Sequence, residues 1–344
     1  MNRKITTALM TILLVSAAMA GCAGEEESNL DPSDGGYEYA SNVDNHRMLV
    51  EDVCDIKDLS EAHDWEGVKK IYQNGKHAEK SDGSYRTLVG FADATGKKHG
   101  LDSYYDLATP LDDFLISALD GTGMFEGASA SVREQAVEKG VQNQIMVAYT
   151  IHELNSAISK AEAGNFGTND AQHAWDEGWA FYHGLDEYTS CSPYATGDKR
   201  AGNFGTENSE GTAEANAAIL VAMNNGLTAF QAEDLAGATQ ARDEVLKNVI
   251  IIYSQATIRY AQKMHDDMES GNTDAAKTHQ SEGLSFWRVI EAYVDDANRS
   301  SINDIYNLAN EPISGEDYQG AVRDALQPAW ENYGITTEDI GTLQ

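Results

Sequence analysis

The side chains best suited to hold a metal ion lie in two short runs, IHEL (151–154) and HAWDEGWAFYHG (173–184). In the second run, His173 and Glu177 are four residues apart, so on a helix they share one face and can bind one cation. Such a pair is also common as an exposed ion pair that contributes a few tenths of a kcal/mol. Spacing alone therefore leaves a metal site and a surface ion pair both open.

The first run contains His152 and Glu153 as direct neighbours. Adjacent residues of a helix point about 100° apart, so only one of the two can face a common site squarely. Glu153 is the favoured ligand of the pair, and Tyr149 lies one turn before it. Carboxylate, imidazole and phenol groups together suit iron or a similar borderline-to-hard ion better than a soft one.

A partial copy of this region occurs further along the chain. The run EAGNFGTNDAQHAWDEGWAFY (162–182) parallels ESGNTDAAKTHQSEGLSFW (269–287), and the helical sequences before each run also align. Shared features are Glu-x-Gly-Asn at the end of a helix, a His, a Glu-Gly and two aromatic residues. The sequence therefore predicts a duplicated helix-pair unit, at about 130–190 and 237–297.

The repeat contributes a second His–acid pair, His279 and Glu282, which are three residues apart. Glu282 aligns with Glu177, so the two carboxylates would converge if the units packed about a pseudo-two-fold axis. A lone pair such as His279 and Glu282 is also common on an exposed helix face. The predicted metal ligands are Glu153, His173, Glu177 and Glu282, with His152 and His279 as further candidates.

Strand signals are scarce, because alternating β-branched runs are almost absent and the chain has only 5 Pro. The pattern predicts an all-α fold, a helical bundle built from the duplicated helix-pair unit. Helices are expected at about 46–58, 61–79, 100–120, 130–163, 171–188, 211–225, 231–269, 273–296, 300–309 and 316–333. Two segments rich in Gly, Ser, Thr and Asp, 81–96 and 189–210, are expected to be loops.

The N-terminal residues 1–21 are typical of an export signal. Arg3 and Lys4 precede the short apolar run ALMTILLVSAAMA, and small residues stand directly before Cys22. That ending resembles a bacterial lipobox, which implies cleavage before Cys22 and lipidation of its sulfur. Residues 22–40 are expected to form a flexible acidic tether. A folded domain at 41–344 would then reach the membrane only through the lipid.

Two further cysteines, Cys54 and Cys191, remain in the mature chain. In an oxidising, exported compartment a pair of cysteines more often forms a disulfide than a metal site or a nucleophile. The expected pairing is therefore Cys54 with Cys191.

Charge and missing motifs argue against several functions. The chain has 24 Lys+Arg against 56 Asp+Glu, a formal net charge of −32, which repels nucleic acid and anionic lipid headgroups. It contains no GxSxG, HExxH or Walker A sequence. The protein is therefore not expected to be an enzyme. A metal-dependent hydrolase remains an alternative, and it would need an open coordination position and a general base.

Longer stretches carry a family resemblance. They are YQNGKHAEKSDGSYRTLVGFA (72–92), GTGMFEGASASVREQAVEKGVQNQIM (121–146), HEL, HAWDEGWAFYHG and CSPYATGDKRAGNFG (191–205). In this order they resemble the low-iron-inducible periplasmic proteins, an iron-assimilation family, over roughly residues 45–310. The resemblance implies a single iron-binding domain outside the cytoplasm, at the periplasm, outer membrane or cell surface. It also implies an Fe²⁺ or Fe³⁺ ion as ligand and an iron transporter in the membrane as partner.

Two other interpretations stay open on the sequence. Duplicated helical bundles with His and Glu motifs are similar to imelysin-like lipoproteins, which are linked to haem or siderophore uptake, but a clean G-x-H-x-x-E is missing here. A helical surface lipoprotein with an adhesive or structural role would need no metal at all.

Overall fold

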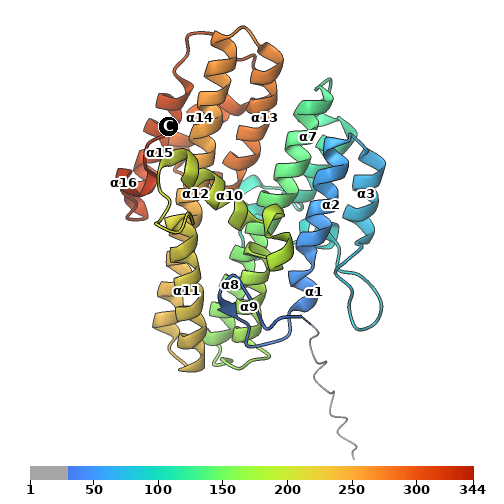
Figure 1. Cartoon of the computed structure of the whole chain (residues 1–344), viewed down its shortest axis with the longest axis vertical. Coiled ribbons are helices and arrows are strands. Elements are labelled where there is room, and N and C mark those ends of the chain that lie inside the picture. The colour runs from blue at the N-terminus through green and yellow to red at the C-terminus, as the bar shows by residue number, and fades with distance from the viewer. Residues whose placement is uncertain (1–29) are drawn as a thin grey trace, which may run out of the picture.

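The helical content expected from the sequence is confirmed by the computed structural model, which describes residues 30–344 (Figure 1). The α-helices are α1 Asp44–Arg47, α2 Leu49–Glu61, α3 Trp65–Asn74, α4 Leu88–Ala92, α5 Leu101–Tyr105, α6 Pro110–Asp120, α7 Ala130–Lys139, α8 Met146–Glu162, α9 Ala171–Tyr182, α10 Pro193–Phe204, α11 Glu214–Gln231, α12 Leu235–Glu269, α13 Thr273–Ile290, α14 Asp296–Tyr306, α15 Tyr318–Asn332 and α16 Thr337–Ile340. Strands β1 (Ser33–Asp34) and β2 (Tyr37–Glu38) form the one sheet in this part of the chain, and they are antiparallel. No helix within residues 30–344 is both long and apolar enough to cross a membrane.

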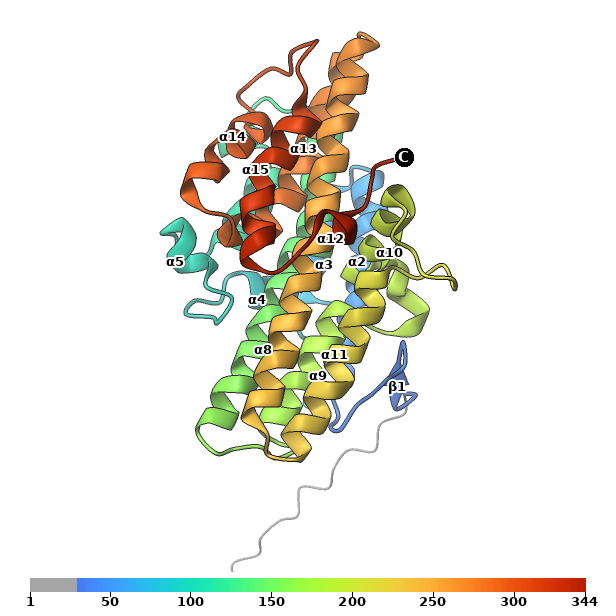
Figure 2. The same ribbon diagram turned by 90° about the vertical axis from the view of Figure 1, so that its left-hand side faces the viewer.

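Two long helical rods run the length of the molecule (Figure 2). One is α12, with 35 residues. The other joins α7 to α8 through a π-helical segment at Gly140–Ile145. The first half of α12 packs with α8, α9 and α11 as a four-helix bundle. Its second half packs with α13 and α15, and α13 also packs on α7.

The ends of α8 and α12 follow from one sequence signal. Each helix ends at the Glu of a Glu-x-Gly-Asn run, and the Gly that follows has a positive φ, +85° at Gly164 and +77° at Gly271. Glycine adopts this left-handed conformation without the steric cost that a side chain brings, so it ends a helix readily. The predicted ends of both helices are confirmed. The structure does not decide whether the two helix pairs arose by duplication.

Two glycines let the helices of this core approach closely. A Cβ on Gly226 would lie 2.1 Å from the Trp175 ring, and one on Gly283 would lie 2.0 Å from the Tyr306 ring. The large aromatic side chains that fill the core are fully buried, among them Trp175, Trp179, Phe181, Tyr182 and Trp287. These aromatic residues therefore build the core and present no open face to a flat ligand such as haem.

Three predicted segments were wrong. The segment 81–96 was expected to be a loop, but residues 88–92 form α4, where the Thr87 side chain accepts from the Gly90 N–H. Residues 193–204 form α10, although 189–210 was expected to be a loop. Pro193 is at the first turn of α10 and Gly205 ends it at φ +69°, and both are favourable helix-end signals within a Gly- and Ser-rich stretch. Conversely, the helix expected over 100–120 is interrupted, because Asp106 is left-handed and Pro110 begins a new helix.

The segment expected to continue the acidic tether up to residue 40 is folded from residue 33 onward. Tyr37 is fully buried, and its hydroxyl donates to Asp176 on α9 at 2.6 Å. The Trp179 indole N–H donates to the carbonyl oxygen of Asp34 at 3.0 Å. The folded domain therefore begins near residue 33. Residues 1–29, which contain the predicted signal and Cys22, lie outside the described part.

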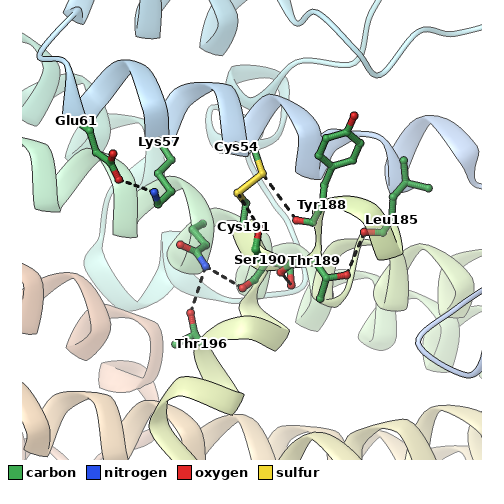
Figure 3. The surroundings of a disulfide bond; sticks show 11 residues. Cys54, Lys57, Glu61, Leu185, Tyr188, Thr189, Ser190, Cys191 and Thr196 are labelled. Carbon is green, nitrogen blue, oxygen red and sulfur yellow. Dashed lines mark hydrogen bonds and ion pairs between the residues drawn. A yellow bond between two sulfur atoms is a disulfide. The ribbon is translucent and has the colours of Figure 1, made fainter. Parts of the chain in front are cut away.

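A disulfide joins Cys54 on α2 to Cys191, just before α10 (Figure 3). The two residues are 137 positions apart, with Cα atoms 5.3 Å from each other. The bond therefore links the N-terminal helices to the segment that leads into α10, as the sequence predicts.

We expect the double variant Cys54→Ala/Cys191→Ala to lose about 2–5 kcal/mol of unfolding free energy, because a long loop of the unfolded chain is no longer closed. Urea unfolding followed by circular dichroism measures the loss. As a control, reductant should lower the midpoint of the wild type and leave that of the variant unchanged. Equal midpoints for the oxidised wild type and the variant would contradict a stabilising disulfide.

Candidate metal centre

Glu177, near the middle of α9, is the centre of a buried His–carboxylate cluster. Its Oε1 atom is 3.3 Å from His173 Nε2, one turn earlier on the same helix, and 3.2 Å from His46 Nδ1 on α1. The side chain of His46 is 3% exposed, that of Glu177 13% and that of His173 33%. The cluster is therefore closed on the α1 side and reaches solvent past His173.

A hydrogen-bond relay fixes the orientation of His173. Three donors converge on the Asp176 carboxylate, namely the Tyr37 hydroxyl at 2.6 Å, the Ser41 N–H at 2.8 Å and the Ser41 hydroxyl at 2.7 Å. The Ser41 hydroxyl hydrogen is engaged in the bond to Asp176, so Ser41 Oγ accepts from His173 Nδ1–H at 2.9 Å. Nε2 is left facing Glu177, where it can carry either a proton or a metal ion.

Of the two imidazoles beside Glu177, His46 is the more deeply buried. Burial lowers the pKa of His46 to about 3, because it outweighs the opposite effect of the Glu177 charge. The imidazole is therefore neutral at pH 7. Its Nδ1 atom is buried and has no hydrogen-bond partner, although it lies beside Glu177. Buried nitrogens of this kind are rare in folded proteins and need a physical reason.

Glu153 on α8 is hydrogen-bonded to Glu177 across the helix interface. Burial and the nearby charge of Glu177 raise the pKa of Glu153 to about 8. Burial acts in the same direction on Glu177, but hydrogen bonding by His173 and the neighbouring cations lower its pKa to about 2. At neutral pH the pair therefore shares one proton, which resides on Glu153, and carries one negative charge.

Arg86 supplies a permanent positive charge beside the carboxylate pair. Its guanidinium acts on both Glu177 and Glu153, and its Nε donates to the side-chain oxygen of Asn45. It comes from the segment between α3 and α4, which is tied by an antiparallel bridge between Glu79 and Tyr85. The positive charge of Arg86, on this loop, therefore balances the negative charge of the Glu153–Glu177 pair.

His152 faces the cluster with the wrong nitrogen for a ligand. The Lys98 N–H donates to His152 Nδ1 at 2.8 Å, so in the neutral ring Nε2 carries the proton. That Nε2 lies 3.7 Å from Glu153 Oε1, and burial lowers the pKa of His152 to about 4. Of the adjacent pair in IHEL, Glu153 is the residue that points at Glu177, and His152 is a neighbour behind it.

The other two predicted ligands interact with a different set of residues. His279 Nδ1 contacts Asp267 Oδ2 at 2.5 Å, which is a pairing with the end of α12. Glu282 Oε1 lies 3.8 Å from Lys139 Nζ, and its carboxylate also interacts with Tyr260. The structure thus brings Glu153, His173 and Glu177 together, with His152 beside them. It attaches His279 and Glu282 to other partners on α12 and α7.

Sequence reasoning missed His46, Arg86 and Ser41. His46 lies 131 positions before Glu177, in a run that lacks the repeated motif. The Tyr37 hydroxyl and the two Ser41 donors, bonded to Asp176, together with the Trp179 indole bonded to Asp34, bring this segment onto α9. The printed sequence carries no local signal for that contact.

The donor spacing matches part of a metal coordination sphere. Neighbouring ligands of an octahedral ion with bonds of about 2.1 Å are about 3 Å apart, close to the separations of 3.2 and 3.3 Å measured here. Within residues 30–344, however, no group of three or more His, Cys, Asp or Glu side chains is already arranged to hold a metal ion. Binding would therefore require side-chain adjustment, above all loss of the proton between Glu153 and Glu177.

A comparison with known protein families identifies the family of this chain. The family model described as "low iron-inducible periplasmic protein" matches residues 10–344. The chain belongs to the low iron-inducible periplasmic protein family. Searches of curated proteins and of solved structures each gave no match. Membership in the low iron-inducible periplasmic protein family relates the protein to iron and supports a location outside the cytoplasm, as its sequence resemblance implied.

The shared proton makes stability depend on pH. Because the folded-state pKa of Glu153 is raised to about 8, the folded protein binds more protons than the unfolded chain between about pH 4.5 and 8. Stability contributed by this group is thus complete below about pH 4.5 and is lost as the pH rises. As the pH rises through this range, we expect the unfolding free energy of Glu153→Gln to increase relative to that of the wild type by up to about 1.4 kcal/mol per pH unit.

Urea midpoints at pH 5.5 and pH 8 measure this change. Glu66→Gln is the matched control, because its carboxylate is 90% exposed and should show no pH-dependent difference. A constant difference between the wild type and Glu153→Gln at both pH values would contradict the shared proton.

Proposed function

We propose that this protein binds an iron ion outside the cytoplasm and assists its uptake, with Glu177, Glu153, His173 and His46 as ligands. The observation that carries the proposal is the convergence of His46 Nδ1 and His173 Nε2 on one oxygen of Glu177, at 3.2 and 3.3 Å. The two imidazoles come from different helices, and His46 Nδ1 has no hydrogen-bond partner. Such convergence is favourable for a cation and unusual for an ordinary packing contact.

The chemistry of the donors supports iron. The set contains carboxylate oxygens and imidazole nitrogens and no thiolate, since Cys54 and Cys191 are bonded to each other. Such donors suit borderline-to-hard ions. Membership in a family named for induction by low iron supports iron as the ion. The oxidation state, Fe²⁺ or Fe³⁺, is not decided by these donors.

Capture would proceed through the residues of the cluster. Glu153 gives up the proton it shares with Glu177, so that both carboxylates become available to the cation. His46 is already neutral, and the Ser41–Asp176 relay holds His173 with Nε2 toward Glu177. Arg86 balances the carboxylate charge in the absence of the ion. The proposed role is that of a carrier, with iron as cargo for a membrane transporter, and not that of a catalyst.

A lipid anchor on Cys22 completes the proposal. Small residues before Cys22 support signal cleavage there, and the polar run after it would tether the folded domain to a membrane. Iron bound at the surface would then be held near the transporter.

We expect Glu177→Gln, His173→Ala and His46→Ala each to weaken Fe²⁺ binding about 100-fold or more, because each removes a ligand. Anaerobic titration calorimetry, with metal analysis for stoichiometry, measures the effect. Glu282→Gln and His279→Ala are matched controls and should bind as the wild type does. Unchanged affinity in Glu177→Gln would refute the centre. A loss confined to the control variants would move the site to the second helix pair.

We expect Cys22→Ser to shift the protein from the membrane fraction to the soluble fraction, because the acceptor of the lipid is gone. Cell fractionation and labelling with a clickable fatty acid measure the shift. Ala23→Ser, one residue further on, is the control and should remain in the membrane fraction and incorporate the label. Membrane retention of Cys22→Ser would contradict lipidation at this residue.

A further inference from the structure

A second group of buried polar side chains surrounds Arg200 on α10. Arg200 is 7% exposed, and its Nε and Nη1 atoms are buried without a hydrogen-bond partner. Its guanidinium stands 5.6 Å from the ring centre of Tyr260 and 5.9 Å from that of Phe286. A buried guanidinium with two free donors is costly unless an acceptor with negative charge meets it.

Asn143 brings a third free donor to the same face. It lies in the π-helical segment and is fully buried. Its Oδ1 atom accepts from the Thr196 and Tyr253 hydroxyls, both at 2.8 Å, so the amide orientation is set and Nδ2 remains without a partner. Thr196 is one turn before Arg200 on α10, which places Asn143 and Arg200 on one side of that helix. π-Helical segments of this kind often occur at functional sites.

The surrounding charge is positive in an otherwise acidic protein. Lys199, next to Arg200, lies near Lys139, Lys57 and Glu138, and Glu282 lies beside Lys139. Lys57 is paired with Glu61, so four cations face three carboxylates. Burial and the nearby Lys139 and Arg200 lower the pKa of Lys199. This local excess of one positive charge contrasts with the net charge of −32 of the whole chain.

Glu138 and Glu282 leave the Nε and Nη1 atoms of Arg200 without a hydrogen-bond partner. Glu138 Oε1 pairs with Lys139 Nζ at 2.7 Å, and Glu282 lies 3.8 Å from the same Lys139. The Tyr260 hydroxyl interacts with both Glu282 and Arg200 and thus stands between them. We propose that these side chains, between α10, the π-helical segment, α12 and α13, form a pocket that binds a small oxyanion of the carboxylate or phosphate class. Arg200 and Asn143 are its donors, and Lys139 and Lys199 supply the long-range attraction.

The predicted duplication relates this pocket to the metal centre. Glu282 interacts with Tyr260 on the preceding helix, as Glu177 interacts with Glu153, and the sequence repeat aligns these pairs. The second pair of helices has the phenol of Tyr260 where the first has the carboxyl of Glu153. The charged neighbours also differ, since Arg200 and Lys139 lie near Glu282, whereas imidazoles lie near Glu177. The same helix-pair arrangement thus holds positive charge in place of negative charge, which suits an anion. This proposal does not depend on iron binding at Glu177.

The test uses the full chain, purified in detergent, and calorimetric titration with inorganic phosphate and with citrate in chloride buffer. We expect at least one of the two probes to bind with a stoichiometry of one anion per chain. The probe that binds more tightly distinguishes the phosphate class from the carboxylate class. Arg200→Gln should weaken binding at least tenfold, because charge-assisted hydrogen bonds are lost. Arg242→Gln is the matched control, since Arg242 is already paired with Asp243 and the change in net charge is the same.

Cooperative thermal unfolding must first show that Arg200→Gln folds. If Arg200→Gln does not fold, the double variant Lys139→Gln/Lys199→Gln provides the test instead. We expect this double variant to fold and to bind the anion at least threefold more weakly than the wild type. The proposal is overturned if the wild type binds neither probe at about 10 mM, or if the deciding variant binds as tightly as the wild type. Glu177→Gln should bind the anion normally, so failure of the iron site and failure of this pocket can be told apart.

Discussion

Two carboxyl groups buried within hydrogen-bond distance of each other, Glu153 and Glu177, are the constraint around which this structure is organised. Two negative charges cannot share such a place, because their repulsion in a poorly solvated site exceeds what water can offset. One group therefore keeps a proton. The remaining charge is balanced by Arg86 and contacted by two imidazoles.

The N-terminal segment is held in place by the same helix. Asp176, next to Glu177, accepts hydrogen bonds from Tyr37 and Ser41 and so holds residues 33–41 against α9. This contact carries the chain into α1, where His46 meets Glu177. Packing and chemistry thus share one face of α9. A change that loosens Tyr37 or Ser41 would disturb the orientation of His173 as well as the fold.

The elements that the sequence predicts well are those with local causes. The i,i+4 spacing of His173 and Glu177 correctly predicts a shared helix face, and Gly164 and Gly271 correctly predict two helix ends. His46 and Arg86 reach the site through tertiary packing alone, and no spacing rule contains that information. The expected approach of Glu282 to Glu177 required a particular packing of the two helix pairs. Instead, Glu282 contacts Lys139 and Tyr260.

The length of α12 has a mechanical consequence. At a rise of about 1.5 Å per residue, its 35 residues form a rod of roughly 50 Å that belongs to the four-helix bundle at one end and to the α13–α15 layer at the other. A continuous helix common to both halves resists bending between them, which distinguishes this arrangement from two-lobed binding proteins whose lobes are joined by loop hinges. Exchange of a bound ion would have to come from local rearrangement, and the loop that carries Arg86 is the segment placed to provide it.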